Sequence, residues 1–450
     1  MKEHIFREYD IRGIVGDELT EEDTAKIAGA IGTFFVRNNA KRIAVGFDAR
    51  ESSGKFSHIV VEQLLKAGCD VVLILRVPTP VLYHTIYTMN EIDGGVMITG
   101  SHNPPDHNGF KICLGEETLF GERIREIKAI VESEDFNSGC GIFGSTNVLD
   151  GYVQDIVSKI DPGPKQLKVV VDAGNGMGGV TSVPVYRELG IEVVELFTKP
   201  DPSFPNHPPD PADPQNLIDL KRTVAANNAD LGIAFDGDGD RITVVDETGR
   251  AVWGDELTTL LAREVLRENP GATVIGEVKC SQVLFDEVAK LGGTPVMCKA
   301  GHSIVKAKMK ETGALLAGEM SGHIFFADRY YGFDDACYAG ARLLQILSDS
   351  DKSLSQLLAD IPQTYSTPEI RIPCSESEKF VIVEELAAGF SKTNEVITID
   401  GARIQFDNGW GLVRPSNTQA ILVLRFEADS AEHLSEIKTT VETRLKALLR

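Results

Sequence analysis

The sequence contains RIAVGFDAR at 42–50, a short apolar strand that leads into a helix-length stretch, and the pattern recurs as LKVVVDAGN at 167–175 and ATVIGEVKC at 272–280. Continuous apolar runs that alternate with helix-length segments are typical of parallel strands buried on both faces. Because the same order of segments occurs three times, the repeat predicts three similar three-layer α/β domains.

Each copy of the pattern continues with a second and then a third apolar run, and the third run ends in a polar loop. The three third runs with their loops are GGVMITGSHN (94–103), LGIAFDGDGD (231–240) and ALLAGEMSGH (314–323). In open α/β sheets, ligands lie beyond the carboxyl ends of the strands. We therefore expect these loops to divide the work of one site: the first offers a hydroxyl group, the second a row of carboxylates, and the third a Glu and a Ser that can bond hydroxyl groups.

The last segment of the chain follows a different pattern. It reads as strand, helix, two or three strands, helix, and the stretch from Asp429 to Glu432 resembles a capping box before the final helix. The expected fold is α/β, with three topologically similar three-layer domains of mixed, mostly parallel sheets and a C-terminal α+β domain around a central cleft. The expected domain ranges are 1–147, 148–250, 251–362 and 363–450.

Composition limits the class of protein. A net charge of −22 argues against a broad nucleic-acid or anionic-membrane surface, and no segment has the length and apolar character of a membrane span. The seven cysteines are scattered and form no C-x-x-C pair, so we expect them to be reduced. The N-terminus lacks the apolar core of a signal peptide. We expect a soluble cytoplasmic protein that binds neither nucleic acid nor membrane.

The carboxylate loop is DGDGDR at 236–241, in which three acids alternate with glycines directly after an apolar strand. Oxygen-only ligands without nearby Cys or His favour Mg²⁺ over zinc. An EF-hand is excluded because Arg241 occupies the position that needs glycine and because both flanks read as strands. A solvated acidic turn is the remaining structural alternative. The pattern predicts a Mg²⁺ site at Asp236, Asp238 and Asp240.

The serine loop, TGSHNP at 99–104, lacks the G-x-S-x-G pattern of a hydrolase nucleophile, since Asn103 stands where the second glycine would be. A plain polar turn would also explain its composition. A serine that accompanies a separate Mg²⁺ loop instead indicates phosphoryl transfer, in which the cation neutralises phosphate oxygens. We expect Ser101, on an exposed loop, to carry phosphate.

A fourth polar loop, RPSNT at 414–418, lies near the C-terminus. The guanidinium of Arg414 can grip a phosphate in a forked geometry, and Ser416, Asn417 and Thr418 add neutral donors. The alternative is an ordinary hairpin tip.

Together these motifs resemble those of the α-D-phosphohexomutases, most closely their bacterial phosphomannomutase/phosphoglucomutase members. EYDIRG (8–13), TGSHNP, DGDGDR, GEMSGH (318–323) and RPSNT occur in the order found in that family, and the resemblance spans the chain. It implies a four-domain, heart-shaped enzyme of carbohydrate metabolism with Mg²⁺ and an active phosphoserine.

The resemblance also implies residue roles. Ser101 corresponds to the phosphoserine, beside His102, with its phosphate held against Mg²⁺ by the three aspartates. Glu319 and Ser321 correspond to sugar-binding residues, and the RPSNT loop to a clamp on the phosphate that is not transferred. The other residues implied to line the cleft are Tyr9, Arg12, Lys111, Arg241, Lys279, His302 and His323.

The implied reaction interconverts hexose 1-phosphate and hexose 6-phosphate through a hexose 1,6-bisphosphate, which also serves as primer. Lys111, Arg241 and His302 are the acid and base candidates. Two alternatives remain open, a phosphoglucosamine mutase and a sugar-phosphate-binding protein that has lost turnover. We expect a phosphosugar substrate and a monomer or weak dimer.

Overall fold

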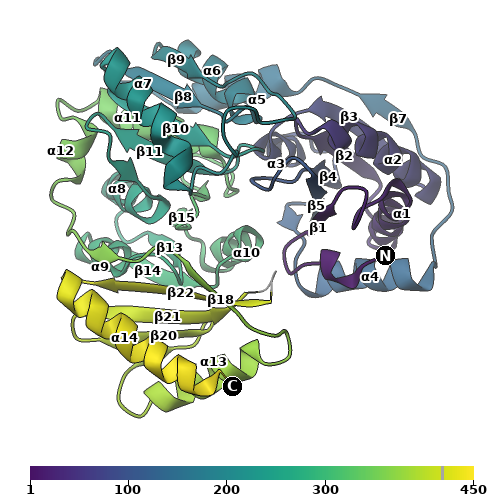
Figure 1. Ribbon diagram of the computed structural model, residues 1–450. Helices are drawn as coiled ribbons and strands as arrows, with labels where there is room; N and C mark the ends of the chain where they lie inside the picture. The colour runs from purple at the N-terminus through teal and green to yellow at the C-terminus, as the bar shows by residue number, and fades with distance from the viewer. Residues whose placement is uncertain (417–419, 450) are drawn as a thin grey trace.

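The computed structural model describes residues 1–416 and 420–449, which form four sheets with their covering helices. In Figure 1 the first sheet lies at the right, the second and third follow at the upper and middle left, and the fourth, in yellow, lies at the bottom. Three of the sheets are mixed and the fourth is antiparallel.

The first sheet has the strand order β1-β5-β4-β2-β3-β7, with β6 paired to β5. Its strands are β1 (Ile11–Ile14), β2 (Arg42–Phe47), β3 (Asp70–Arg76), β4 (Gly94–Ile98), β5 (His107–Leu114), β6 (Glu117–Thr118) and β7 (Phe143–Ser145). The helices of this unit are α1 (Glu21–Arg37), α2 (Glu51–Ala67), α3 (Thr79–Thr88) and α4 (Glu122–Ser133), preceded by a 3-10 turn at Glu3–Ile5.

The second and third sheets have the orders β12-β11-β10-β8-β9 and β14-β13-β15-β16. The second unit contains α5 (Leu149–Lys159), β8 (Lys168–Asp172), α6 (Gly178–Glu188), β9 (Glu192–Leu196), a 3-10 turn at Pro214–Leu217, α7 (Ile218–Asn227), β10 (Leu231–Phe235), β11 (Ile242–Asp246) and β12 (Ala251–Val252). The third unit contains α8 (Gly254–Glu268), β13 (Thr273–Glu277), α9 (Gln282–Lys290), β14 (Thr294–Cys298), α10 (His302–Thr312), β15 (Leu316–Gly318), β16 (Ile324–Phe326), α11 (Ala336–Ser348) and α12 (Leu354–Leu358).

The predicted repeat is present in these three units. The first run of each repeat forms a strand between the other two, as in β3-β2-β4, β9-β8-β10 and β14-β13-β15, and the three strands of each set are parallel. A fourth strand, β5, β11 or β16, then returns antiparallel to the third. Strands β4 and β10 are buried along their whole length, as continuous apolar runs require.

The fourth sheet has the order β17-β22-β21-β20-β19, with β18 also paired to β22. Its elements are β17 (Tyr365–Ser366), β18 (Ile370–Pro373), α13 (Lys379–Phe390), β19 (Val396–Ile397), β20 (Ala402–Phe406), β21 (Gly409–Pro415), β22 (Ile421–Ala428) and α14 (Ala431–Leu448). The expected cap of α14 is displaced by one residue, because Ser430, and not Asp429, accepts the hydrogen bond from the His433 amide.

The apolar core joins the first three units. The largest cluster contains side chains of α3, α5, α6, α8 and α11, including Val81, Tyr152 and Tyr338, whereas the fourth unit has its own cluster between its sheet and α13 and α14. The loops at the ends of the first three sheets are therefore held by one continuous packing layer. No helix in the described part of the chain has the length and apolarity needed to cross a membrane.

Candidate active site

Three polar loops meet at one place, as the repeat predicts. Each connects the third parallel strand of its unit to the antiparallel fourth, after β4, β10 and β15. The hydroxyl of Ser101, in the first loop, donates to Asp236 Oδ2 in the second over 2.9 Å. The backbones of Arg241 and His323 form an isolated antiparallel bridge, which joins the second loop to the third.

Ser101 is buried although the far end of its loop, from Pro104, is exposed, so the expectation that its side chain is exposed is wrong. Ser101 is 1% exposed, and its φ of 48° lies in the left-handed region that non-glycine residues seldom adopt. Its hydroxyl also lies 3.2 Å from His102 Nδ1. Burial, with Arg241 nearby, holds the pKa of His102 well below its ordinary value, so this imidazole is neutral.

Arg50, which sequence reasoning missed, holds this loop in place. Its buried guanidinium donates to the carbonyls of Ser101 and Asn103 at 2.7 and 2.6 Å, and also to those of Pro104 and His107. A Cβ on Gly100 would come within 2.5 Å of the guanidinium, so the close approach requires glycine there. The only hint in the sequence was its place directly after the first repeated strand.

The three aspartates of the carboxylate loop are fully buried, and one oxygen of each lies within 4.8 Å of the others. Burial raises the pKa of Asp236 well above its ordinary value, and the neighbouring Asp238 and Asp240 raise it further. Asp238 Oδ1 is buried without a hydrogen-bond partner, whereas Asp240 Oδ1, also buried, forms an ion pair with His323 Nε2 at 3.3 Å. A buried carboxylate oxygen without a donor carries a large desolvation cost unless a cation faces it, so this cluster fits a divalent metal ion.

Lys111, on β5 of the first unit, neutralises part of the negative charge of the three aspartates. Its ammonium donates to Asp238 Oδ2 over 2.8 Å and also to Asp240 Oδ2. Burial opposes its charge, but these two carboxylates raise the pKa of Lys111 above the ordinary value. Burial also opposes the charge of Arg241, but the nearby Asp236 and Asp240 carboxylates outweigh it and raise the pKa of Arg241. Both side chains therefore remain cationic, so they can only donate hydrogen bonds.

The third loop places Glu319, Ser321 and His323 together. His323 Nδ1 lies 2.7 Å from Glu319 Oε2, and His323 Nε2 lies 3.3 Å from Asp240 Oδ1. Burial works against a charged imidazole, but Asp240 and Glu319 raise the pKa of His323 to about 9. Glu319 is correspondingly acidic: burial opposes its ionisation, but His323 and Lys279 bring its pKa to about 2. Ser321 Oγ donates to Glu319 Oε2 over 3.3 Å.

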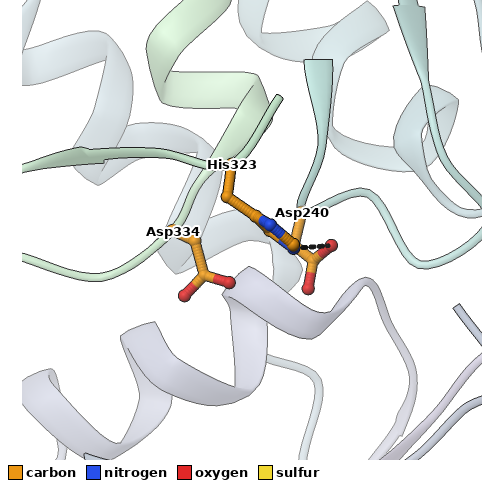
Figure 2. A group of neighbouring side chains, drawn as sticks. All are labelled: Asp240, His323 and Asp334. Atoms are coloured by element: carbon orange, nitrogen blue, oxygen red, sulfur yellow. Dashed lines mark ion pairs between the residues drawn. The ribbon is translucent and has the colours of Figure 1, made fainter. Parts of the chain in front are cut away.

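Asp334 completes a second group of possible metal ligands that the sequence did not indicate. Figure 2 shows the side chains of Asp240, His323 and Asp334 gathered together, and one possible ligand atom of each lies within 4.8 Å of the others. Lys306 Nζ already pairs with Asp334 Oδ1 at 2.8 Å. A protonated imidazole offers no lone pair to a metal, so we interpret this group as an ion-pair network.

His302 begins α10 and lies against this network. Its ring stacks on that of His323 with centroids 5.5 Å apart, and its Nδ1 is 3.6 Å from Asp334 Oδ2. Burial, with the nearby Lys306 and Lys111 charges, keeps the pKa of His302 well below its ordinary value. His302 is therefore a buried neutral imidazole among charged groups.

The fourth loop lies at the end of β21. Arg414 is 8% exposed, and its guanidinium donates to Asp400 Oδ2 over 3.0 Å. The Ser416 carbonyl accepts from the Lys379 ammonium at 2.6 Å. The expected donors Asn417 and Thr418 lie outside the described residues. Asp400 also accepts from the Ala300 amide at 3.2 Å, so this loop lies against the third unit.

The remaining predicted residues surround these loops. Tyr9 donates to the Ala300 carbonyl over 2.8 Å, which brings the N-terminal segment beside the third unit. Arg12 donates to Asn103 Oδ1 over 2.9 Å in the serine loop. Lys279 pairs with Glu369 at 2.9 Å, and although burial opposes it, Glu369 raises the pKa of Lys279.

Family models match nearly the whole chain. They are described as phosphoglucomutase/phosphomannomutase alpha/beta/alpha domains I, II and III, at residues 3–138, 150–249 and 253–365, and the C-terminal domain at 369–444. The chain belongs to this family. The family resemblance and the four-unit α/β fold are thereby confirmed.

Similar members of the phosphoglucomutase/phosphomannomutase family extend over the full length. A phosphomannomutase/phosphoglucomutase from Pseudomonas aeruginosa is 48% identical over 448 residues, covering 99% of this chain and 96% of the relative. A phosphoglucomutase from Neisseria gonorrhoeae is 46% identical over 451 residues, covering 99% and 96%. A crystal structure of a family protein from Burkholderia thailandensis superposes with a TM-score of 0.94 at 42% identity, covering 100% of this chain and 98% of the other.

Proposed function

We propose that this phosphohexomutase interconverts the 1-phosphates and 6-phosphates of mannose and glucose, with Ser101 as the phosphate carrier. The observation that carries the proposal is the contact of the Ser101 hydroxyl with Asp236, 2.9 Å apart, at the edge of a buried cluster of three carboxylates. A hydroxyl held against a cation-binding cluster suits phosphoryl transfer. Relatives that match 99% of the chain are named phosphomannomutase/phosphoglucomutase and phosphoglucomutase.

In the proposed reaction, the phosphoryl group leaves phospho-Ser101 for the free hydroxyl of the bound hexose phosphate. The bond from phosphorus to Ser101 Oγ breaks, the bond to the sugar oxygen forms, and the hydroxyl proton passes to a base. The resulting hexose 1,6-bisphosphate turns around in the site and returns its other phosphate to Ser101. The product is the positional isomer, and added bisphosphate primes any enzyme that has lost its phosphate.

Asp236, Asp238 and Asp240 would hold Mg²⁺ together with phospho-Ser101. When bound, this cation neutralises phosphate oxygens and stabilises the charge that shifts during transfer. Asp238 Oδ1 supports the assignment, because it is buried without a hydrogen-bond donor. The Oδ2 atoms of Asp238 and Asp240 both accept from Lys111.

Proton transfer is assigned to the groups around the serine loop. Lys111 and Arg241 have raised pKa values and act as donors to phosphate oxygens. His302, whose pKa burial lowers, is neutral and is the better candidate for accepting a proton. His102 adds a second neutral imidazole beside Ser101.

Recognition of the sugar phosphate is assigned to the third and fourth loops. Glu319, Ser321 and His323 would bond sugar hydroxyls, while Arg414 with the RPSNT loop would grip the phosphate that is not transferred. Tyr9, Arg12 and Lys279 add polar groups around them. Because the intermediate must bind in two orientations, contacts to phosphate should outweigh contacts to one face of the ring.

The remaining properties follow from charge and composition. A net charge of −22 disfavours nucleic-acid or anionic-membrane partners. We propose a cytoplasmic enzyme that acts as a monomer or weak dimer on a small phosphosugar. The domain ranges 1–147, 148–250, 251–362 and 363–450 remain part of the proposal.

Steady-state assays with glucose 1-phosphate, mannose 1-phosphate and glucosamine 1-phosphate test the function. With Mg²⁺ and glucose 1,6-bisphosphate present, we expect the glucose and mannose substrates to give the higher kcat/KM values, and chelation of the metal to abolish turnover. If glucosamine 1-phosphate gave the highest kcat/KM, the protein would instead be assigned as a phosphoglucosamine mutase. No conversion of any substrate would indicate a sugar-phosphate-binding protein.

A further inference from the structure

A threonine of the first unit contacts the carboxylate loop of the second. Thr79 is the first residue of α3 and is fully buried. Its hydroxyl donates to Asp238 Oδ2 over 2.6 Å, and its amide donates to the Asp238 carbonyl over 2.8 Å. One side chain of the carboxylate loop is therefore held from a neighbouring unit.

The two oxygens of the Asp238 carboxyl group are used differently. Oδ2 accepts from Thr79 Oγ1 and from Lys111 Nζ, and both donors belong to the first unit. Oδ1 is buried and has no hydrogen-bond partner. Two donors on one oxygen fix the rotation of the carboxylate and leave the other oxygen without a protein donor, in a cluster where one oxygen of each aspartate lies within 4.8 Å of the others.

The packing around α3 makes this arrangement rigid. Pro78 and Pro80 flank Thr79, which restricts the backbone at the start of the helix. Gly239 has a φ of 74°, and a Cβ there would come within 3.1 Å of Pro78 Cβ, so the carboxylate loop lies directly against this segment. The positive end of the α3 dipole also favours a carboxylate at this point.

We propose that Thr79 is a positioning residue for the metal site, so that the cation affinity of the second unit depends on a hydroxyl supplied by the first. Thr79 acts through Asp238 and contacts neither substrate nor metal itself. The inference rests on the proposed function in one respect only, namely that the three aspartates bind a divalent cation. Partners that orient a metal ligand in this way typically contribute about 10- to 100-fold to affinity.

The test measures Mn²⁺ affinity directly, by electron paramagnetic resonance of the free ion, in the full-length protein with matched Ser101 phosphorylation. Thr79→Val keeps the shape of the side chain and removes the donor. We expect its Mn²⁺ dissociation constant to rise about 10- to 100-fold. Thr79→Ser restores the hydroxyl and should return the affinity close to the wild-type value.

A matched control comes from the same helix. Thr85 is also buried, but its hydroxyl donates to the Val81 carbonyl within α3. Thr85→Val should leave Mn²⁺ affinity unchanged, whereas a loss equal to that of Thr79→Val would show that any perturbation of α3 weakens the site, and would overturn the inference. Unaltered affinity in Thr79→Val would also overturn it. Absence of Mn²⁺ binding by the wild-type protein would instead refute the metal site of the proposed function.

Discussion

Arg50 organises the serine loop although it lies outside the TGSHNP motif of that loop. Its side chain is fully buried, its Nε donates to Asp48 over 3.1 Å, and its other donors reach four carbonyls between Ser101 and His107. Asp48 also accepts from Thr99 at 2.8 Å. The position of the Ser101 hydroxyl therefore depends on a network centred on Arg50.

Arg50→Lys keeps the charge but cannot reach the same set of carbonyls, since an ammonium lacks the planar fork of a guanidinium. We expect kcat to fall about tenfold or more, with little change in KM, because a 1 Å misplacement of a reacting group can cost about two orders of magnitude. Steady-state kinetics measure the separate effects on kcat and KM. Hydrogen exchange should show faster opening of residues 99–106 in the variant.

Arg342→Lys provides the matched control. Arg342 is equally buried, but it pairs with Glu264 and Asp328. The control should lower thermal stability with kcat retained. A similar loss of kcat in both variants, or a rise in KM alone for Arg50→Lys, would show that Arg50 has no special part in placing Ser101.

Groups of residues that are adjacent in the sequence could be predicted, whereas groups that the fold assembles from distant segments could not. The three aspartates stand within five residues, so their grouping in space could be predicted from DGDGDR alone. Thr79, Arg50 and Asp334 each act through contacts with residues distant in the chain, and their types are common in ordinary turns and helix ends. The sequence predicted Ser101 as the candidate phosphate carrier but did not predict its burial, because loop composition does not report which neighbouring unit covers a loop.

At the element scale, the placement of the loops follows from the strands. Continuous apolar runs predicted strands that are buried on both faces and therefore parallel. The polar segments after the third strand of each unit lie at the same edge of the sheet in all three units. The N-cap residue of α14 could not be predicted to the exact position, because Asp429 and Ser430 are both favourable N-cap residues. In the structure Ser430 has an extended backbone and accepts from the His433 amide, while Asp429 pairs with the His433 ring.

The N-terminus of α11 gives a pH-dependent prediction. Asp335 caps this helix and accepts from the hydroxyls of Tyr152, on α5, and Tyr330. Burial raises the pKa of Asp335 to about 6, and these hydrogen bonds offset only part of that effect. In an unfolded chain the same carboxyl titrates near its ordinary value of about 3.9.

A raised carboxyl pKa means that the folded state holds the proton more tightly, so the contribution of Asp335 to stability is greatest below pH 4 and is lost as pH rises through about 6. The difference amounts to about 3 kcal/mol for a shift of about two pKa units. Asp335→Asn removes this titration. We expect its melting temperature, relative to wild type, to increase between pH 4 and pH 7, as measured by calorimetry. A difference that stays constant across this range would contradict the assignment.

At the scale of the whole molecule, the four units are less independent than the sequence suggests. The repeat predicts separate modules, but one apolar cluster runs through the first three. The fourth is attached to the third by buried arginines, since Arg403 donates to the carbonyls of Val278 and Cys280 at 2.7 and 2.9 Å. Such contacts pair residues far apart in the chain, and apolar periodicity within one segment carries no information about its partner.

This assembly joins the serine loop to the second unit and the second loop to the third, and we propose that Ser101 carries the phosphate that is transferred. The direct measurement is peptide mass spectrometry of the protein after incubation with glucose 1,6-bisphosphate and Mg²⁺, before and after addition of glucose 1-phosphate. We predict that the wild-type protein carries one phosphate group on Ser101 and that this group exchanges with the sugar phosphates. Ser101→Ala should lack this phosphate and lose turnover, whereas Ser416→Ala should retain the phosphate. Phosphate on a different residue, or turnover at the wild-type rate by Ser101→Ala, would contradict the account.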